Sequence, residues 1–411
     1  MTLTHNVFLP WRGNCVHNLV QVGTFLFGAL ALTISSGYSY GPAILFLVSL
    51  AVCWRPSYWV SMPKEMKGLA LVFIFYVLIQ ALSIWMDGGK LREFDRPSRV
   101  LMVVVILPLL ARYPARLTSL ISGVSVGACI SGAIAIHDKL YLGMPRAFYD
   151  SMPIQSGNIS MTMGLLCLCC YFWCRKEGNN RDAIVMLFSC GMGMLGSLLS
   201  GTRGGWVLLP MIVLSIIIYF RTSIIRVDKV VMALFCAAAI GLVFIPKTGM
   251  LSRIEAVKND ISNYVDGGNR NTSVGIRFQL WQSAFDAFLE KPIWGWGNNG
   301  VREAHAKQLA DGRISHFVYD FNSHAHNQFL DEMAKRGLIG LTILLALFLY
   351  PLTIYARAQR CSTLPPILIG VSVMTLFDYS LTQAFISHNS GITFFPMIFS
   401  ILVSIEADSR A

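Results

Sequence analysis

The sequence predicts an all-α integral membrane protein with about twelve transmembrane helices and one long helical loop that caps the membrane domain. Hydrophobic residues make up 55% of the chain and charged residues only 13%, and the mean hydropathy is +0.57. Apolar runs of about 20 residues, which is enough to cross a bilayer, recur along the chain. One polar stretch late in the chain, residues 247–325, is far longer than the other breaks between these runs.

The apolar runs and the polar breaks between them divide the chain into three regions. The predicted spans lie near residues 19–35, 40–54, 68–86, 99–112, 117–137, 158–174, 183–200, 205–220, 229–246, 337–356, 366–382 and 389–405. Residues 1–246 therefore hold the first nine spans, and residues 247–325 form the cap loop. Residues 326–411 begin with a predicted helix start at His326 and hold the last three spans.

Lys and Arg are distributed unequally between the two sets of short loops. If the N-terminus is cytoplasmic, the cytoplasmic loops hold 15 of these residues and the opposite loops hold 7. Because positively charged loops remain in the cytoplasm, both termini are predicted to be cytoplasmic and the cap loop to lie outside. The net charge of +11 is therefore explained by topology and contact with membrane lipids. No nucleic-acid partner is expected, because the sequence lacks basic clusters interleaved with aromatic residues.

The cap loop has the composition of a folded segment rather than a disordered one. Its aromatic residues include Trp281, Phe285, Phe288, Trp294, Trp296, Phe317, Tyr319 and Phe321. Apolar residues recur at helical spacing between Ile276 and Leu289, which predicts a helix lying along the membrane interface. Lys291-Pro292 is expected to end this helix, and the glycines that follow are expected to form turns.

Two arginines on the predicted outer side have the surroundings of a phosphate site. Arg203 lies in the turn SGTRGG at residues 200–205, where a guanidinium group and glycine backbone amides suit a phosphate. The alternative is an arginine that reaches lipid headgroups. Arg277 opens the predicted helix of the cap loop, where an anion is favoured. The alternative for Arg277 is an ordinary solvated helix residue.

A third basic cluster, in the outer loop at residues 90–99, contains Arg92, Arg96 and Arg99. Because cations are disfavoured on this side, contact with an anionic lipid or a phosphorylated sugar would explain them. Neutralisation by neighbouring acidic residues is the alternative. Two of these acids, Glu93 and Asp95, also form a pair that could hold a divalent metal ion.

His326 is the strongest candidate for a general base. Leu330, Met333 and Gly337 follow it at four-, seven- and eleven-residue steps, which predicts one helical face running from His326 into the membrane. A neutral imidazole at this boundary can accept a proton from a hydroxyl group. The alternative is a histidine that only anchors the helix at the interface.

The neighbours of His326 have separate predictions. His324 is expected to point elsewhere, whereas Asn327 and Asp331 lie close enough in sequence to orient His326. His388-Asn389 repeats the dipeptide in another outer loop, but no pair of glycines like Gly337 and Gly340 follows it. The dipeptide alone therefore does not identify a base.

These motifs together resemble the O-antigen ligase and O-antigen polymerase superfamily. The shared features are His326-Asn327 followed by the GLIG sequence at residues 337–340, and Arg203 in a Ser/Thr-Arg-Gly turn. A third feature is an outer segment with an arginine, a tryptophan and a Pro…Gly-x-Gly turn. It is matched by Arg277, Trp281, Pro292 and Gly295-Trp296-Gly297. The resemblance covers roughly residues 180–345.

The resemblance implies an inverting glycosyltransferase that needs neither a metal ion nor a cofactor. Its donor would be a polysaccharide on undecaprenyl pyrophosphate, and its acceptor the lipid A-core at the periplasmic face of the bacterial inner membrane. His326 would then activate the acceptor hydroxyl, and Arg203 and Arg277 would hold the pyrophosphate. His324 and Asn327 would support this site. We expect Arg92, Arg96 and Arg99 to meet the phosphorylated core, which is an inference from charge and not part of the resemblance.

Three other functions remain open at this stage. A polymerase that joins repeat units, or an enzyme that transfers the glycan to protein hydroxyls, would use the same donor and the same residues. A transporter of lipid-linked sugar would instead need charged residues near the middle of the spans and inverted repeats, neither of which is evident. The chain length, the number of predicted spans and the late position of the long loop favour the ligase.

Overall fold

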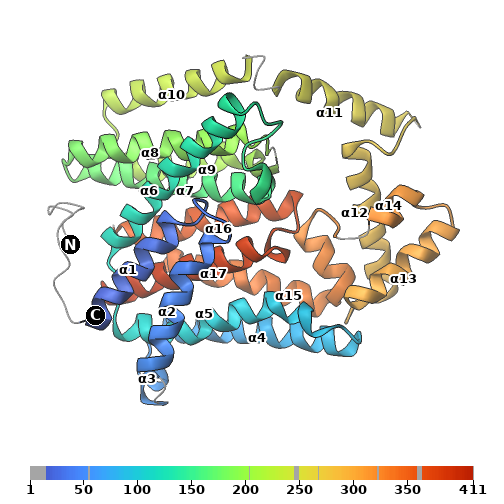
Figure 1. Ribbon diagram of the computed structural model, residues 1–411, viewed down its shortest axis with the longest axis horizontal. Helices are drawn as coiled ribbons and strands as arrows, with labels where there is room; N and C mark the ends of the chain where they lie inside the picture. Colours follow the sequence, from blue (N-terminus) through green and yellow to red (C-terminus); the bar gives the residue numbers. More distant parts are fainter. Residues whose placement is uncertain are drawn as a thin grey trace.

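The computed structural model describes residues 15–53, 56–202, 204–244, 250–266, 268–321, 324–358 and 363–410, and every regular element in these ranges is helical. Figure 1 shows that the described helices form a bundle with a smaller group of helices at one end. Most of the long helices form a bundle with roughly parallel axes, and α12, α13 and α14 gather at one end of it. The all-α prediction is confirmed.

Among the residues that the structure describes, seven helices are long and apolar enough to cross a membrane. They are α4 (Lys64–Met86), α6 (Leu117–Ile136), α7 (Pro153–Lys176), α8 (Asn180–Leu199), α15 (Gln328–Ala358), α16 (Leu364–Thr382) and α17 (Asn389–Asp408). The remaining predicted spans fall on α1 (Cys15–Ala29), α2 (Tyr40–Val52), α5 (Asp95–Arg112), α9 (Leu209–Phe220) and α10 (Arg226–Phe244). The chain is therefore that of a multi-pass membrane protein, and its crossing at all twelve segments stays a prediction.

The centre of the bundle is formed by α7, α16 and α17. Within their most apolar windows, 94%, 83% and 94% of the residues are buried inside the protein. Small residues allow close packing here: a Cβ atom added to Gly193 of α8 would lie 2.8 Å from the Cα of Gly164 in α7. These central helices give the outer helices and the loops a fixed support.

One end of the bundle collects the loops that the topology predicts to be outside. At this end α15 and α17 begin and α16 ends. Gln328 of α15 accepts a hydrogen bond from the backbone of Ile386, and Ser390 of α17 donates to Gln155 of α7. At the opposite end α1 begins close to where α17 finishes (Figure 1). The described ends of the chain thus lie at the same end of the bundle, and that this end is cytoplasmic stays a prediction.

The cap loop folds into helices, as its composition predicts. They are α11 (Met250–Val265), α12 (Ser273–Glu290), α13 (Gly297–Ala310) and α14 (His316–Phe321). The side chain of Thr272 caps α12 by accepting a hydrogen bond from the amide of Gly275, and Pro292 follows the end of the helix. Figure 1 shows α12 lying across the direction of the bundle helices. A helix at residues 276–289 is confirmed, and its position along the membrane interface stays a prediction.

The prediction that His326 starts a helix is wrong. Helix α15 begins at Gln328, and His326 has a φ of 50°, in the left-handed region. The reason is Asn327, whose side-chain oxygen accepts hydrogen bonds from the amides of Phe329 and Leu330 at 3.0 and 3.1 Å. An asparagine that caps a helix in this way stops the helix from extending toward the N-terminus.

The predicted continuous face from His326 to Gly337 is also wrong, because α15 is interrupted at Gly337 (φ 61°, ψ −152°). The turn after α12 enters at this point. The amide of Leu338 donates to the carbonyl of Pro292 at 2.8 Å, and the amide of Trp296 donates to the carbonyl of Ala334 at 2.9 Å. The break is therefore stabilised by the cap, and it couples the cap to α15.

Candidate functional site

His326 lies in the short segment that leads into α15 and faces the loop between α16 and α17. Its Nδ1 atom lies 2.7 Å from Oε1 of Gln383. A side-chain amide oxygen can only accept a hydrogen bond, so Nδ1 carries the proton of the neutral ring. The lone pair of the imidazole is then on Nε2, which is the arrangement that a general base requires.

Two further histidines surround this pair. The rings of His324 and His326 meet edge to face with centroids 4.3 Å apart, and the ring of His388 lies 5.8 Å from that of His324. The prediction that His324 points elsewhere is therefore wrong, because His326 leaves the helical conformation and its amide donates to Nδ1 of His324 at 3.2 Å. Gln383 bridges His326 and His388, since its Nε2 lies 3.3 Å from Nε2 of His388.

All three histidines are held in the neutral form. Burial, together with His326, lowers the pKa of His324 to about 3. Burial, with the charge of Arg96, lowers the pKa of His388 to about 4. Burial also lowers the pKa of His326, assisted by the charge of Arg277, although the hydrogen bond with Gln383 opposes this shift. A neutral imidazole at physiological pH is ready to accept a proton.

Arg277 is thus brought close to His326, although the two residues are 49 positions apart in the sequence. It lies near the start of α12, as the fifth residue of the helix, and is half-buried; burial lowers its own pKa. Among the residues that the structure describes, Arg277 has no acidic partner. A desolvated cation without a counter-ion is suited to an anionic ligand.

The segment around His326 is fixed by several hydrogen bonds. The carboxylate of Asp331 accepts from the amide of Ala325 at 3.0 Å and pairs with Lys335 at 2.8 Å. Asn327 donates through Nδ2 to the carbonyl of Leu381. Asn327 and Asp331 therefore position the backbone, whereas the ring of His326 is oriented by Gln383, a residue that the sequence reasoning missed. The one feature of the sequence that could have pointed to Gln383 is its position at the end of a predicted span, on the predicted outer side.

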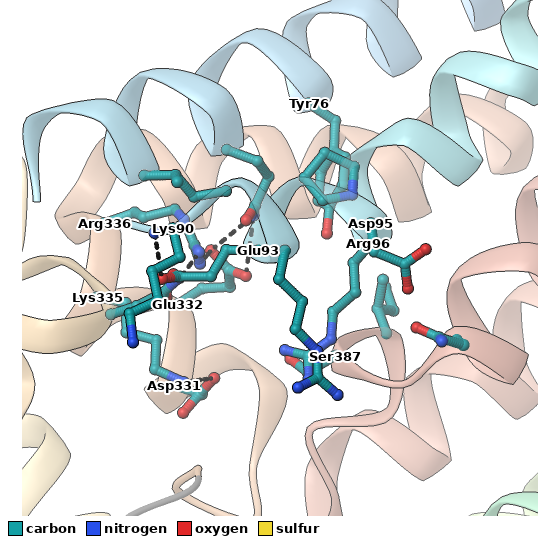
Figure 2. Close-up of a pocket in the computed structure, with 17 residues that line it drawn as sticks. Tyr76, Lys90, Glu93, Asp95, Arg96, Asp331, Glu332, Lys335, Arg336 and Ser387 are labelled. Carbon is teal, nitrogen blue, oxygen red and sulfur yellow. Dashed lines mark hydrogen bonds and ion pairs between the residues drawn. The ribbon is translucent and has the colours of Figure 1, made fainter. Parts of the chain in front are cut away.

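A cavity of about 520 Å³ lies beside this segment (Figure 2). Figure 2 shows Asp331, Glu332, Lys335 and Arg336 on one side of the cavity, and Arg96 and Ser387 on the other. On the first side the charges are paired: Arg336 bonds to Glu332 at 2.9 Å and also to Asn298. This part of the wall is thus a fixed ionic network.

The cations on the other walls are available to a ligand. Arg92 and Arg96 line the cavity and are exposed, and neither has an ion pair within the described ranges. Arg99, which was grouped with them, is not in the cavity lining. It donates to Ser39 and pairs with Asp95 at 3.4 Å instead, because it lies one turn further along α5.

The acidic pair Glu93 and Asp95 is separated by these contacts. Glu93 accepts hydrogen bonds from the amide of Lys90 and from Asn298, each at 3.0 Å, and thereby ties the loop to α13. Asp95 faces Arg99. In the described part of the chain no group of three His, Cys, Asp or Glu side chains is placed to hold a metal ion.

Arg203, the other predicted phosphate ligand, lies outside the described residues. Its neighbours in the turn are placed. Thr202 donates to the carbonyl of Pro153 at 3.1 Å, and a Cβ on Gly204 would overlap the hydroxyl of Thr382. Thr382 directly precedes Gln383, so the described part of this turn lies beside the histidine cluster.

Comparison with known proteins gives three matches. A family model described as O-antigen ligase matches residues 183–345. The chain is 31% identical over 379 residues to a Haemophilus influenzae protein described as uncharacterized, covering 90% of this chain and 94% of that protein. It is 24% identical over 200 residues to the O-antigen ligase of Escherichia coli, covering 48% of this chain and 45% of that one.

Proposed function

This chain belongs to the O-antigen ligase family, and we propose that it transfers a polysaccharide from undecaprenyl pyrophosphate to the lipid A-core. The observation that carries the proposal is the grouping of a neutral His326, oriented by Gln383, with Arg277 beside an open cavity that contains unpaired cations. The protein lies in the inner membrane with twelve spans, both termini cytoplasmic and this site facing the periplasm, as its loop charges favour.

The proposed reaction is a single displacement at the anomeric carbon of the donor. Nε2 of His326 removes the proton of an acceptor hydroxyl as that oxygen attacks, and a new glycosidic C–O bond forms. The bond from the anomeric carbon to the pyrophosphate oxygen breaks, and undecaprenyl pyrophosphate leaves with the electron pair. One displacement inverts the anomeric centre. A positioned base contributes about 10²- to 10⁴-fold to such a reaction.

The leaving group gains negative charge as its bond breaks, and arginines supply the compensation. Arg277 is desolvated, and its charge acts on His326, so it can also act on an anion bound beside that ring. Arg203 is assigned to the same pyrophosphate because the described part of its turn lies beside Gln383. With two guanidinium groups on the pyrophosphate, the proposed reaction requires no metal ion.

The lipid A-core acceptor accounts for the cavity at Arg92 and Arg96. Both are cations without acidic partners among the described residues, on a side of the membrane where cations are disfavoured. Phosphate groups on the acceptor would pair with them. A polymerase would also bind pyrophosphate-linked glycans, so these cations do not by themselves separate the two reactions, and the transfer assay below does.

A reconstituted transfer assay tests the proposal. Purified protein is mixed with undecaprenyl-pyrophosphate-linked glycan and lipid A-core in detergent containing EDTA, and glycan on lipid A is followed by gel electrophoresis. Transfer in EDTA is the expected result. Growth of the glycan on the donor without transfer to the core would indicate a polymerase instead. Transfer that EDTA abolishes would contradict the metal-free mechanism.

The pH dependence of transfer should report the state of His326. The base must be neutral, and its pKa is lowered from the ordinary value of 6.5, so its protonation limits the rate only below that value. We expect kcat/KM to be constant from about pH 6.5 upward and to fall on the acid side of about 6.5. Initial rates of transfer across this range measure it. If this acid limb of the pH profile were centred above pH 7, the assignment of His326 as the base would be contradicted.

Gln383 is expected to act as a positioning residue. Gln383→Leu removes the acceptor of the Nδ1 proton, so the ring loses its orientation and kcat should fall about 10- to 100-fold. Gln383→Glu keeps an acceptor oxygen and adds a negative charge that stabilises the protonated ring. This variant should retain more activity than Gln383→Leu and move the acid limb of the pH profile upward. Equal loss in both variants with an unchanged limb would indicate a purely structural role.

A further inference from the structure

A second cavity, of about 380 Å³, lies on the other side of the loop between α16 and α17. Arg96, Ser387 and Asn389 line both this cavity and the cationic one described above. The remaining walls come from the segment between α1 and α2 and from the segment that enters α7. The two cavities therefore adjoin each other at a shared wall.

The chemistry of the second cavity differs from that of the first. Its lining holds one cation, Arg96, and one carboxylate, Asp150, so their formal charges cancel. Most of the other polar groups are serine hydroxyls and side-chain amides, together with the phenol of Tyr38. Such groups both donate and accept hydrogen bonds, and Tyr38 adds an apolar ring face. This lining suits an uncharged ligand rich in hydroxyl groups, not a phosphate.

Gln155 gives the cavity a buried polar group that is only half used. It is 2% exposed, and its Oε1 accepts a hydrogen bond from Ser390 at 3.3 Å. Its Nε2 is buried and has no hydrogen-bond partner in the part of the chain that the structure describes. A buried amide donor without a partner is costly, and a ligand hydroxyl would satisfy it.

The backbone around this cavity is strained in the same way as at His326. Four non-glycine residues in the described ranges have positive φ: Ser36, Phe148, Met152 and His326. Ser36 and Met152 line the second cavity. Strained conformations of this kind concentrate at functional sites.

The cavity is connected to the proposed catalytic group through His388 and Gln383. His388 lies in its wall, and Gln383 connects His388 to His326 through contacts of 3.3 and 2.7 Å. A sugar in this cavity would therefore lie close to the reacting centre. If the sugar belongs to the acceptor, the phosphate groups of that substrate would extend past Ser387 toward Arg96 and the first cavity.

We propose that this second cavity binds an uncharged saccharide unit of one of the two lipid-linked substrates, with Gln155 and Tyr38 as its recognition residues. The inference rests on the proposed transfer function and adds to it a site for the sugar itself. The glycan of the donor and the core sugar of the acceptor have the same hydroxyl chemistry, and measurement distinguishes between them.

The test compares Gln155→Leu and Tyr38→Ala with Tyr40→Ala in the full-length protein. Tyr40, the first residue of α2, is an exposed tyrosine two positions after Tyr38 and is not in the lining of either cavity, so it is the matched control. In the transfer assay both cavity variants should raise KM for one substrate roughly 3- to 10-fold, as expected for one lost hydrogen bond or ring contact, with kcat within about twofold. The substrate affected identifies the source of the sugar.

A binding measurement keeps this inference separate from the proposed reaction. Two probes, the donor glycan and the outer-core oligosaccharide, each released from lipid and phosphate, are titrated against wild type and variants by saturation-transfer NMR. One probe should bind wild type and Tyr40→Ala and bind both cavity variants at least about threefold more weakly. If the cavity variants bind the probe more weakly but the wild-type protein transfers no glycan, the sugar site is supported and the proposed reaction is contradicted. Transfer with unchanged KM and unchanged binding in both cavity variants would overturn the sugar site alone.

Discussion

Replacing His326 with alanine is expected to lower kcat for transfer by about 10²- to 10⁴-fold, because the acceptor hydroxyl loses the group that takes its proton. The ring is half-buried and lies in the short segment before α15, not in the packed centre of the bundle, so folding should be little affected. KM for the donor should change little, since the proposed pyrophosphate ligands are Arg203 and Arg277. Initial rates at saturating donor and acceptor measure both constants.

Two other histidines serve as controls for this result. His316→Ala removes an exposed ring in α14 and should leave kcat unchanged. His388→Ala removes the far member of the contact through Gln383 and should lower kcat less than His326→Ala does. If His388→Ala were the more damaging of the two, the base would have to be reassigned to His388.

Hydropathy was sufficient to predict the long apolar helices but not the way in which they meet, nor α13, whose first turn contains Gly297 and Gly300, which were expected to form turns. The apolar runs and the periodicity between Ile276 and Leu289 correspond to helices because each follows from local sequence. The break at Gly337 could not be predicted in the same way. Gly337 lies inside an apolar run with helical spacing, and its φ of 61° is imposed by a turn more than 40 residues earlier in the chain.

The candidate site shows the same division between local and long-range information. Residues in sequence motifs, such as His326 and Arg277, could be selected from residue type and spacing. Gln383 could not, because its role depends on a loop folding back against the start of α15. Tertiary contacts of this kind leave no periodic signal in a single sequence.

The junction at Gly337 should be the position least tolerant of a side chain. Its φ of 61° and ψ of −152° lie in a region that essentially only glycine occupies. A Cβ there would also overlap the carbonyl groups of Pro292 and Ile293. Backbone strain and steric overlap together predict that Gly337→Ala destabilises the protein by about 3 kcal/mol or more. Its apparent Tm in detergent should fall by at least about 3 °C.

The matched control for this substitution is Gly300→Ala. Gly300 lies in the first turn of α13, where the nearest atom to an added Cβ is 3.5 Å away, so the Tm of the Gly300→Ala variant should be unchanged or slightly raised.

The Gly337→Ala substitution should also lower activity. Loss of the hydrogen bonds between the turn and α15 would shift α12, and with it Arg277, relative to His326. Misplacement of about 1 Å costs about 10²-fold in rate, so Gly337→Ala should lose transfer even below its Tm. Full activity and an unchanged Tm would mean that the cap and α15 are not coupled at this junction.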